Sequence, residues 1–570
     1  MKHSDPEKKE ILTKTLALSG TIIAFAFFLF FSYLQQAQTN NPGTPYNKID
    51  PALHGYMAKN PPYPFEKKYT LPVISITTDE KNLWDPEIGI YVEGNDDNFR
   101  QKGMEWERPA TLQYYDATQK FQFEIPFGLR MHGGATRKHP QKSFKVITRR
   151  EYGPRYINYP FFPDHRYTKF DRIILRNSGN DWRSTMIRDV LMHNLMAPFF
   201  DSLAGTPSVV YLNGEYWGIY NIREEFDERY FKETYGAKKT RVVVIEPNRD
   251  YDGYPDVDIG REGDELHYVE MRDFILQNDM TDPDNYAYIQ TKMDTDNYID
   301  YLLIGIFLHK TDWLDHNFAI WRYRTEEYDP SAPEALDGRW RWLHFDMDSC
   351  MTERKTPPVL GNDRLYDMIK PDQKKPWIAA LYQALLKNED FKTDFINRYA
   401  DLVNTRFRKE VILAQIEDAA DQIKPELPNH IARWKGTLDK GGKPPFSSVE
   451  MWEENLDVLR KFANVRADYT RQHFINNFNL PGLTELNLNT SPGDGGSIRV
   501  NSVYYSSFRY KPIYFQGVPI EIEAIPDDGF RFVGWEGDLP PELSNQRSVT
   551  VTFDEDVFYL SAVFEEVSEE

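Results

Sequence analysis

The chain has 570 residues, which is too long for one compact hydrophobic core, so we expect roughly two to four domains. Its formal net charge of -20 argues against nucleic acid as the main partner, and fits either a soluble ectodomain or an enzyme that acts on basic proteins. With a single cysteine, Cys350, the chain has no intrachain disulfide framework.

The N-terminus carries a long apolar run. It extends from Ile11 to Leu34 and is uncharged after Lys14, and about twenty apolar residues are enough to span a bilayer. Lysines precede the uncharged part of the run and none comes just after it, which places the N-terminus in the cytoplasm. We therefore predict that residues 1–34 form a cytoplasmic tail and transmembrane anchor, with the body of the protein at the cell surface or in the periplasm. A cleaved secretion signal is the alternative. Residues 35–68, rich in Asn, Pro and Gly, indicate a linker.

Strand patterns dominate the part of the chain that follows the linker. The runs LPVISITTD, GIYVEG, PATLQYYD and FQFEIPFGLRMHGG alternate apolar and polar residues between turn residues, which predicts a β-rich segment over 69–126 and beyond. Further on, SVVYLNGEYWGIYNI predicts a hairpin that turns at Asn213 and Gly214. The charged run REEFDERYFKETYG predicts an amphipathic helix that ends near Gly236.

Helical patterns dominate the second half of the chain. A nearly continuous apolar pattern from Tyr298 to Leu308 predicts a buried helix, and several amphipathic helices are expected between Trp377 and Trp434. A break in composition near residue 480 is followed by short strand patterns, which predict a separate all-β module over 484–566.

Residues suited to catalysis gather in the middle of the chain. Asp312 is followed five residues later by Asn317, and Asp346 and Asp348 come after an aromatic, strand-like run. Protein kinases place a catalytic base and two magnesium ligands in this way: an acid, an amide five residues on, and another acid after a short hairpin. On an extended strand the last two carboxylates would face the same way and share a metal. Ordinary turn and capping roles are the alternative.

A basic stretch with two glycines, RMHGGATRKHPQKSFKV, lies upstream. Its glycines allow a tight turn, and Arg137, Lys142 and Lys145 bring cations close to that turn. Such a loop can cradle phosphates through backbone N–H groups and a lysine, although a solvated basic hairpin is the alternative. The two lysines lie on opposite faces of the predicted strand, so one can point into a cleft while the other faces water.

Acidic residues lie between the lysine hairpin and the candidate catalytic residues. Glu224 and Glu225 stand where a predicted strand gives way to a helix. A kinase needs a glutamate to hold its phosphate-binding lysine, whereas an acid that favours the helix macrodipole needs no partner. The stretch RNSGNDWRSTMIRD, with Asp181 and Asp189, indicates a structural salt-bridge network.

Four segments in this order resemble the spore coat protein H (CotH) kinase family. They are LRMHGGATRKHPQKSFKV, YLNGEYWGIYNIREEFDERYF, KTDWLDHNFAIWRYR and RWRWLHFDMDS. The resemblance covers roughly residues 70–475 and implies an α+β, atypical two-lobed protein-kinase-like fold. It also implies transfer of phosphate from ATP, with Mg²⁺, to serine or threonine of a protein.

The resemblance assigns roles to the candidate catalytic residues. Asp312 resembles the catalytic aspartate, and Asn317 resembles the asparagine that follows it in the family. The pair Asp346 and Asp348 resembles the family's metal-binding aspartates.

It also implies an ATP-binding set. Lys142 resembles the lysine that holds the ATP phosphates, with Lys145 as the fallback and Arg137 nearby. Glu224 resembles the glutamate that would pair with this lysine.

The chain departs from the family pattern at two positions, where Lys310 replaces a frequent Asn and Phe345 replaces a Trp. A lysine so close to the catalytic aspartate is expected to lower the proton affinity of that base. The C-terminal module is similar to the divergent internalin-B-type repeat, which implies adhesion or spacing. We therefore predict a CotH-like kinase at the cell surface, and the alternative is a surface structural or adhesion protein that keeps the fold without the reaction.

Overall fold

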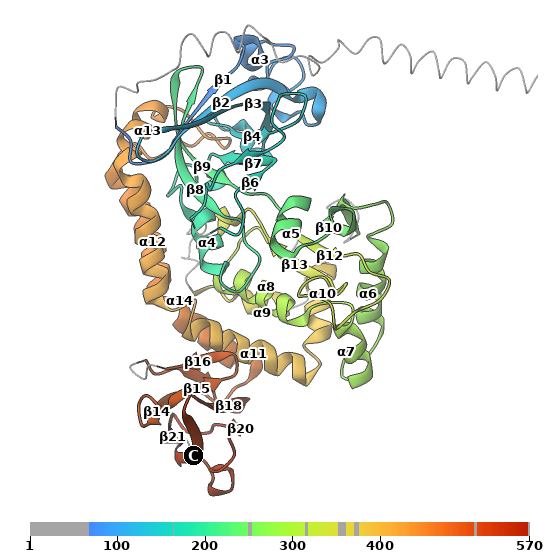
Figure 1. The fold of residues 1–570 in the computed structure, drawn as a ribbon, viewed down its shortest axis with the longest axis vertical. Coiled ribbons are helices and arrows are strands. Elements are labelled where there is room, and N and C mark those ends of the chain that lie inside the picture. The colour runs from blue at the N-terminus through green and yellow to red at the C-terminus, as the bar shows by residue number, and fades with distance from the viewer. Residues whose placement is uncertain are drawn as a thin grey trace, which may run out of the picture.

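The computed structural model describes residues 68–163, 165–248, 254–313, 317–351, 361–369, 376–506 and 510–567. The predicted anchor at residues 11–34, and the linker up to residue 67, lie outside these ranges. Within them, no helix is both long and apolar enough to cross a membrane. The described chain forms an upper lobe, a lower lobe and a β module below them (Figure 1).

The upper lobe is a closed β-barrel. Its strands are β1 (Val73–Thr77), β2 (Arg108–Tyr115), β3 (Phe121–His132), β4 (Ser143–Ile147), β7 (Arg172–Arg176), β8 (Gly205–Leu212) and β9 (Glu215–Arg223). Their order is β1-β2-β3-β4-β7-β9-β8, and a parallel pairing of β1 with β8 closes the ring. The predicted hairpin is confirmed, because Asn213 and Gly214 turn between β8 and β9 with φ of 50° and 84°. Three small elements decorate the barrel: α3 (Glu80–Trp84), β5 (Ile157–Asn158) and β6 (Lys169–Phe170).

The strand predicted at GIYVEG is wrong, because this segment forms a turn-rich loop. The side chain of Asn98 donates to the carbonyl oxygens of Pro86 (3.0 Å) and Gly89 (3.1 Å), which holds the loop in a compact shape. Ile90 and Tyr91 are buried because they pack against the barrel core. Their burial reproduces a strand-like pattern without any strand pairing.

The barrel strands are two-faced. Phe144 and Leu175 are paired across β4 and β7 and belong to the barrel core. Their neighbours Lys145 and Ile174 are paired on the opposite face, beside Arg223 of β9. Because side chains alternate along a strand, the outer face of β4, β7 and β9 presents charged residues to the lower lobe.

The lower lobe combines a four-stranded sheet with helices. Its sheet order is β11-β10-β12-β13, and the strands are β10 (Val242–Pro247), β11 (Pro255–Ile259), β12 (Phe318–Tyr323) and β13 (Arg341–His344). Two helices come from the connections between the lobes: α4 (Arg188–Met196) and α5 (Glu228–Tyr235). The other helices of this lobe are α6 (Leu266–Gln277), α7 (Pro283–Gln290), α8 (Thr295–Phe307), α9 (Arg364–Ile369), α10 (Pro376–Leu385) and α11 (Glu389–Asn404). The predicted buried helix is α8, and the predicted charged helix is α5, which ends at Gly236.

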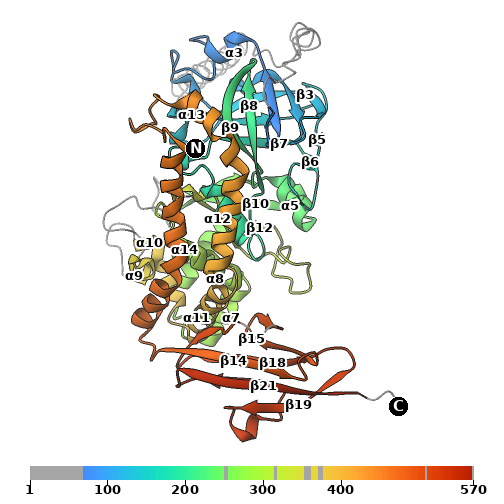
Figure 2. The same cartoon turned by 90° about the vertical axis from the view of Figure 1, so that its left-hand side faces the viewer.

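Three further helices connect the lobes. They are α12 (Lys409–Ile423), α13 (Leu427–Trp434) and α14 (Val449–Phe478). Figure 2 shows α12 and α14 running side by side from the lower lobe to the barrel. At the barrel, His430 of α13 accepts the backbone N–H of Ile219 (3.1 Å), and Trp434 donates to the carbonyl of Trp217 (3.1 Å). These contacts brace the two lobes against each other.

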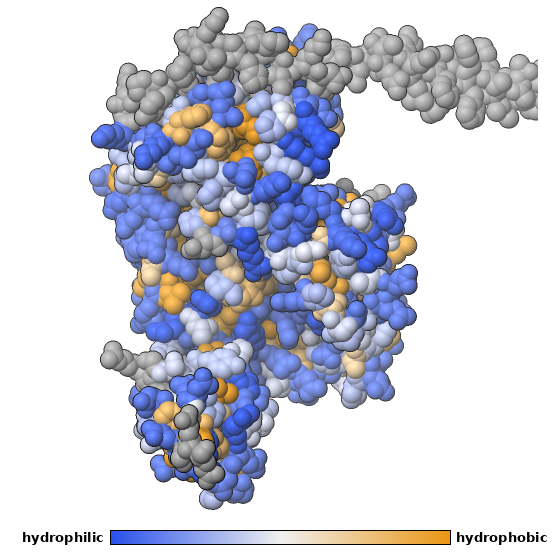
Figure 3. Space-filling model, viewed as in Figure 1, coloured by the Kyte–Doolittle hydropathy of each residue, from blue (hydrophilic) through white to orange (hydrophobic). Residues whose placement is uncertain are grey.

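The C-terminal region is all-β, as expected. Its two four-stranded sheets have the orders β17-β14-β21-β19 and β16-β15-β18-β20. The strands are β14 (Leu483–Ser491), β15 (Gly496–Val500), β16 (Val503–Tyr505), β17 (Ile513–Phe515), β18 (Pro519–Pro526), β19 (Phe530–Gly537), β20 (Ser548–Thr552) and β21 (Val557–Glu566). On the face shown in Figure 3 the surface is mostly hydrophilic, with apolar patches on both lobes.

The β module is fastened to α11 by buried polar contacts. Asp401 accepts hydrogen bonds from the backbone N–H (3.1 Å) and hydroxyl (2.5 Å) of Ser502 and from the hydroxyl of Tyr514 (2.9 Å). Asn404 accepts the backbone N–H of Ile513 (3.0 Å) and donates to its carbonyl (2.9 Å). The apolar cores of the lower lobe and the module are continuous. The module is therefore part of the folded body rather than a loosely tethered spacer.

Asn404→Ala is expected to lower the free energy of unfolding by about 2 kcal/mol, because it leaves both backbone groups of Ile513 without their partner. Chemical denaturation of the full chain measures this change. The matched control is Asn397→Ala, which removes only an exposed amide bond to Pro519 and should cost less than about 0.5 kcal/mol. Equal stabilities for the two variants would contradict a fastened module.

Candidate functional site

The largest concentration of candidate residues lines a pocket of about 650 Å³ between the barrel and the lower lobe. Its apolar lining comes from both lobes: Ile174 of the barrel, and a cluster of Leu203, Phe226, Val244, Ala319 and Phe345. Such a lining can pack against a flat aromatic ring of a ligand. Asp312, Asn317 and Asp346 line the same pocket, so three of the candidates from distant parts of the sequence do lie together.

Lys310 holds the candidate catalytic residues in place. It is fully buried, and its ammonium group donates to the carbonyls of Asn317 (2.6 Å) and Phe345 (2.8 Å). Burial lowers the pKa of Lys310, an effect that nearby acids including Asp312 oppose. The lysine thus joins the loop after α8 to the end of β13. It binds backbone oxygens next to the site, and the carboxylate of Asp312 instead accepts the hydroxyl of Ser349.

Asp346 and Asp348 do not lie on an extended strand. Asp346 has φ of 53° and precedes a short 3-10 helix at Met347–Ser349. Both carboxylates nevertheless meet the guanidinium of Arg176, and Asp348 lies 2.9 Å from it. Asp348 also accepts the backbone N–H (2.6 Å) and side-chain amide (3.1 Å) of Asn180 and is 1% exposed. Asp346 therefore faces the pocket, whereas Asp348 is engaged in holding the loop.

At the centre of this cluster, sequence reasoning missed Arg176 and gave Asp189 only a place in a structural salt-bridge network. Arg176, at the end of β7, lines the pocket between the two aspartates. Asp189 of α4 accepts the backbone N–H of Met347 (2.8 Å) and lies 3.0 Å from Arg223. Burial alone would raise the pKa of Asp189, but the cations of Arg223 and Arg176 outweigh it and hold this pKa below its usual range. The dense charge of RNSGNDWRSTMIRD was the available signal.

The pocket offers oxygen ligands suited to Mg²⁺. Asn317 supplies an amide oxygen and Asp346 a carboxylate, and Mg²⁺ is commonly bound by one or two carboxylates together with substrate phosphates and water. Among the described residues, no group of three or more His, Cys, Asp or Glu side chains is placed to hold a metal. The donor set therefore fits a magnesium ion that is carried partly by a nucleotide. The oxygens of Asp348 are already taken by N–H donors.

The structure places the two candidate lysines in different surroundings. Lys142 precedes β4, is buried, and donates to the carbonyls of Arg137 (2.6 Å) and His139 (3.0 Å). Burial lowers its pKa to about 8. It neither lines the pocket nor faces water, whereas Lys145 forms an ion pair with Glu225, which does line the pocket. Of the two candidate lysines, Lys145 is therefore the one held next to the pocket, through Glu225.

Glu224 and Arg137 make contacts with groups other than the candidate phosphate-binding lysine side chains. Glu224 lines the pocket but accepts the backbone N–H of Ala204 (2.8 Å) and contacts His165 (2.8 Å) instead of Lys142. Arg137 donates to the carbonyls of Gly133 (2.5 Å) and Gln101 (2.7 Å). It therefore stabilises the glycine turn from behind, while the turn itself lines the pocket.

One further lining residue comes from far along the chain. Lys440 lies in the connection between α13 and α14 and reaches the same pocket as the glycine turn. No local pattern marks it, because only the return of the chain from the lower lobe to the barrel brings it there.

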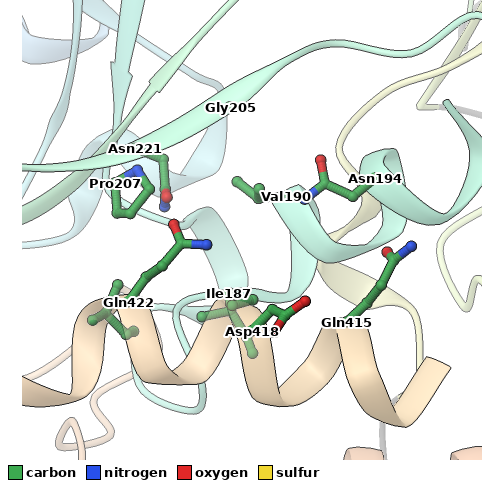
Figure 4. A pocket seen from close by; sticks show the side chains of 11 residues that line it. Ile187, Val190, Asn194, Gly205, Pro207, Asn221, Gln415, Asp418 and Gln422 are labelled. Atoms are coloured by element: carbon green, nitrogen blue, oxygen red, sulfur yellow. The ribbon is translucent and has the colours of Figure 1, made fainter. Parts of the chain in front are cut away.

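Helix α4 separates this pocket from a smaller one of about 300 Å³ (Figure 4). Asp189 and His193 face the large pocket, whereas Val190 and Asn194 face the small one. In the small pocket, side chains of α12 such as Gln415 point toward α4 and the barrel strands. None of the sequence-predicted candidates lines it, so the large pocket is the candidate active site.

Comparisons with known proteins agree with this placement. The model of a family described as CotH kinase protein matches residues 129–470, more than half of the chain. A second model, described as divergent InlB B-repeat domain, matches residues 486–568. No curated protein matches the chain. The first match includes every candidate residue of the pocket, and the second coincides with the β module.

Proposed function

The chain belongs to the CotH kinase protein family, and we propose that it transfers the γ-phosphoryl group of Mg-ATP to a serine or threonine hydroxyl of a protein acceptor. The observation that carries the proposal is the convergence of Asp312, Asn317 and Asp346 on one pocket. Glu225, which holds Lys145, lines the same pocket beside the glycine turn. Positioning and electrostatics of this kind are what phosphoryl transfer requires.

Each part of the pocket has a distinct role in this proposal. The apolar lining packs against the adenine ring, and Lys145 with the backbone of the glycine turn binds the phosphates. Asn317 and Asp346 would hold Mg²⁺, which when bound neutralises charge on the phosphate oxygens. Asp312 accepts the proton of the acceptor hydroxyl while the hydroxyl oxygen bonds to the γ-phosphorus. The bond from that phosphorus to the β–γ bridging oxygen breaks, and ADP leaves.

Asp312→Asn is expected to reduce phosphate transfer by about 10²–10⁴-fold, because the amide cannot accept the proton. The measurement is transfer of γ-labelled phosphate from Mg-ATP to protein by the full chain. Asp329→Asn, in an exposed turn, is the control and should be fully active. Retained transfer in Asp312→Asn would rule out this residue as the base.

Mg-ATP at about one hundred times its Kd should also stabilise the full chain by about 2.7 kcal/mol. If neither stabilisation nor transfer occurs, the protein is instead a surface structural protein that keeps the kinase fold.

We propose in addition that residues 11–34 anchor the protein with its kinase domain outside the cytoplasm. The support is the apolar run and the lysines that precede it. Protease added to intact cells should then degrade a C-terminal epitope tag. Protection of the tag until lysis would reject this orientation.

A further inference from the structure

A pocket of about 650 Å³, distinct from the small pocket beside α4, adjoins the candidate active site. The two pockets share Lys440 and the glycine turn at residues 133–135. A ligand that fills the adjoining pocket would therefore reach the turn and the lysine that also line the site of phosphate transfer.

This adjoining pocket is lined by cations and by small residues. Its charged side chains are Arg100, Lys102, Arg137, Lys138 and Lys440. No Asp or Glu is among the described residues that line it. We call it the basic pocket. Such a cluster is unusual in a chain whose formal net charge is -20, and it focuses positive potential at one place beside the site.

The charges of the basic pocket are poorly neutralised. Arg100 lies 3.4 Å from Asp97, but both side chains are about half exposed, so water screens the pair. In the described part of the chain, no carboxylate lies within ion-pair distance of Lys102, Lys138 or Lys440. The guanidinium of Arg137 is bound to carbonyl oxygens, which hold it in position without cancelling its charge. The pocket thus offers an anionic ligand one fixed cation, Arg137, surrounded by exposed cationic side chains.

We propose that the basic pocket binds an acidic segment of the protein acceptor, next to the hydroxyl that receives the phosphate. This inference rests on the proposed kinase function and specifies its substrate class. It reverses the basic acceptor expected from net charge, because recognition depends on the local field at the site rather than on the sum over the molecule. A lysine-rich segment at the same place would meet like charges, which disfavours the wrong acceptor.

Anionic groups could also come from the nucleotide, since the glycine turn and Lys440 line both pockets. Lys102 and Lys138 line the basic pocket but not the candidate active site. Substitutions of these lysines therefore distinguish an acidic acceptor segment from nucleotide phosphates as the bound anion. A change at these two lysines should alter acceptor binding and leave Mg-ATP binding as it is.

The first test compares two fluorescent peptides, each with a central serine, flanked by glutamates in one and by lysines in the other. Anisotropy is measured with the full chain in the absence of nucleotide. The acidic peptide is expected to bind at least about tenfold more tightly at low salt, and the difference should shrink as salt screens the charges. Equal binding of the two peptides, or tighter binding of the basic one, would overturn the proposal.

The second test reverses the charge of the pocket with Lys102→Glu and Lys138→Glu together. The affinity for the acidic peptide should fall by about tenfold or more, and the basic peptide should gain. The control is Lys461→Glu, an exposed site on α14, which should bind as wild type does. Circular dichroism checks that each variant is folded.

The outcome separates this inference from the proposed function. A double variant with a raised KM for Mg-ATP and unchanged peptide affinity would assign the basic pocket to nucleotide phosphates and overturn the inference alone. Selective acidic-peptide binding without any phosphate transfer would support the inference and count against the kinase activity.

Discussion

Asp346→Asn is expected to lower phosphate transfer by about a thousandfold while the protein stays folded. Asp346 lines the pocket and supplies the carboxylate that a magnesium ion would share with Asn317. The amide keeps the size of the side chain and can still accept a hydrogen bond from Arg176, but it lacks the negative charge. Loss of metal-assisted charge stabilisation costs several kcal/mol, and each 1.36 kcal/mol is about tenfold in rate.

Asp348→Asn is the matched comparison. Asp348 is buried and receives N–H donors from Arg176 and Asn180, so its removal leaves a buried cation without one of its partners. We expect this change to lower the free energy of unfolding by about 1–3 kcal/mol, because Arg176 keeps Asp346 and Asp189 as partners. Transfer rates and denaturation curves are measured for both variants. If Asp348→Asn were stable and inactive while Asp346→Asn kept its activity, the two assignments would have to be exchanged.

Lys145→Met is expected to lower kcat/KM for ATP by about 10²–10³-fold. Lys145 projects from the outer face of β4 toward the cleft, and Glu225 holds its ammonium group beside the pocket. A fixed cation at transferring phosphates is worth about as much as one donor of an oxyanion hole. Methionine keeps the length of the side chain and removes the charge. Steady-state kinetics at varied Mg-ATP concentration measure the effect.

Lys142→Met should affect stability instead. Its ammonium group donates to the carbonyls of Arg137 and His139 and lies 4.3 Å from the ring of Phe99. Loss of these contacts is expected to cost about 1–3 kcal/mol of unfolding free energy, because two carbonyls lose their donor. A stable Lys142→Met variant that fails to use ATP, beside a normal Lys145→Met, would restore the assignment made from sequence.

Local patterns predicted much of this protein because they depend on neighbouring residues. Alternation and the Asn-Gly turn were enough for the β8–β9 hairpin, and a continuous apolar run was enough for α8. The same reasoning failed at GIYVEG, where Ile90 and Tyr91 are buried by a loop that Asn98 closes through its side chain. A buried loop and a strand produce the same pattern, since both bury side chains at intervals.

Sequence by itself determined the kinds of residues at the candidate site and their order along the chain. The sequence identifies Asp312, Asn317 and Asp346 as candidates, and the structure places all three in the lining of one pocket. Tertiary structure shows the surroundings of the candidate lysines: Lys145 is paired with Glu225 of the pocket lining, whereas Lys142 is buried against backbone carbonyls.

For the two lysines the physical reason is that side chains alternate along an extended chain, so positions an odd number of residues apart lie on opposite faces. Contacts between segments far apart in the sequence determine which other residues line the pocket. Arg176 meets Asp346 across the cleft, and Lys440 arrives on the connection between α13 and α14. No periodicity encodes such meetings, because they depend on how the two lobes pack.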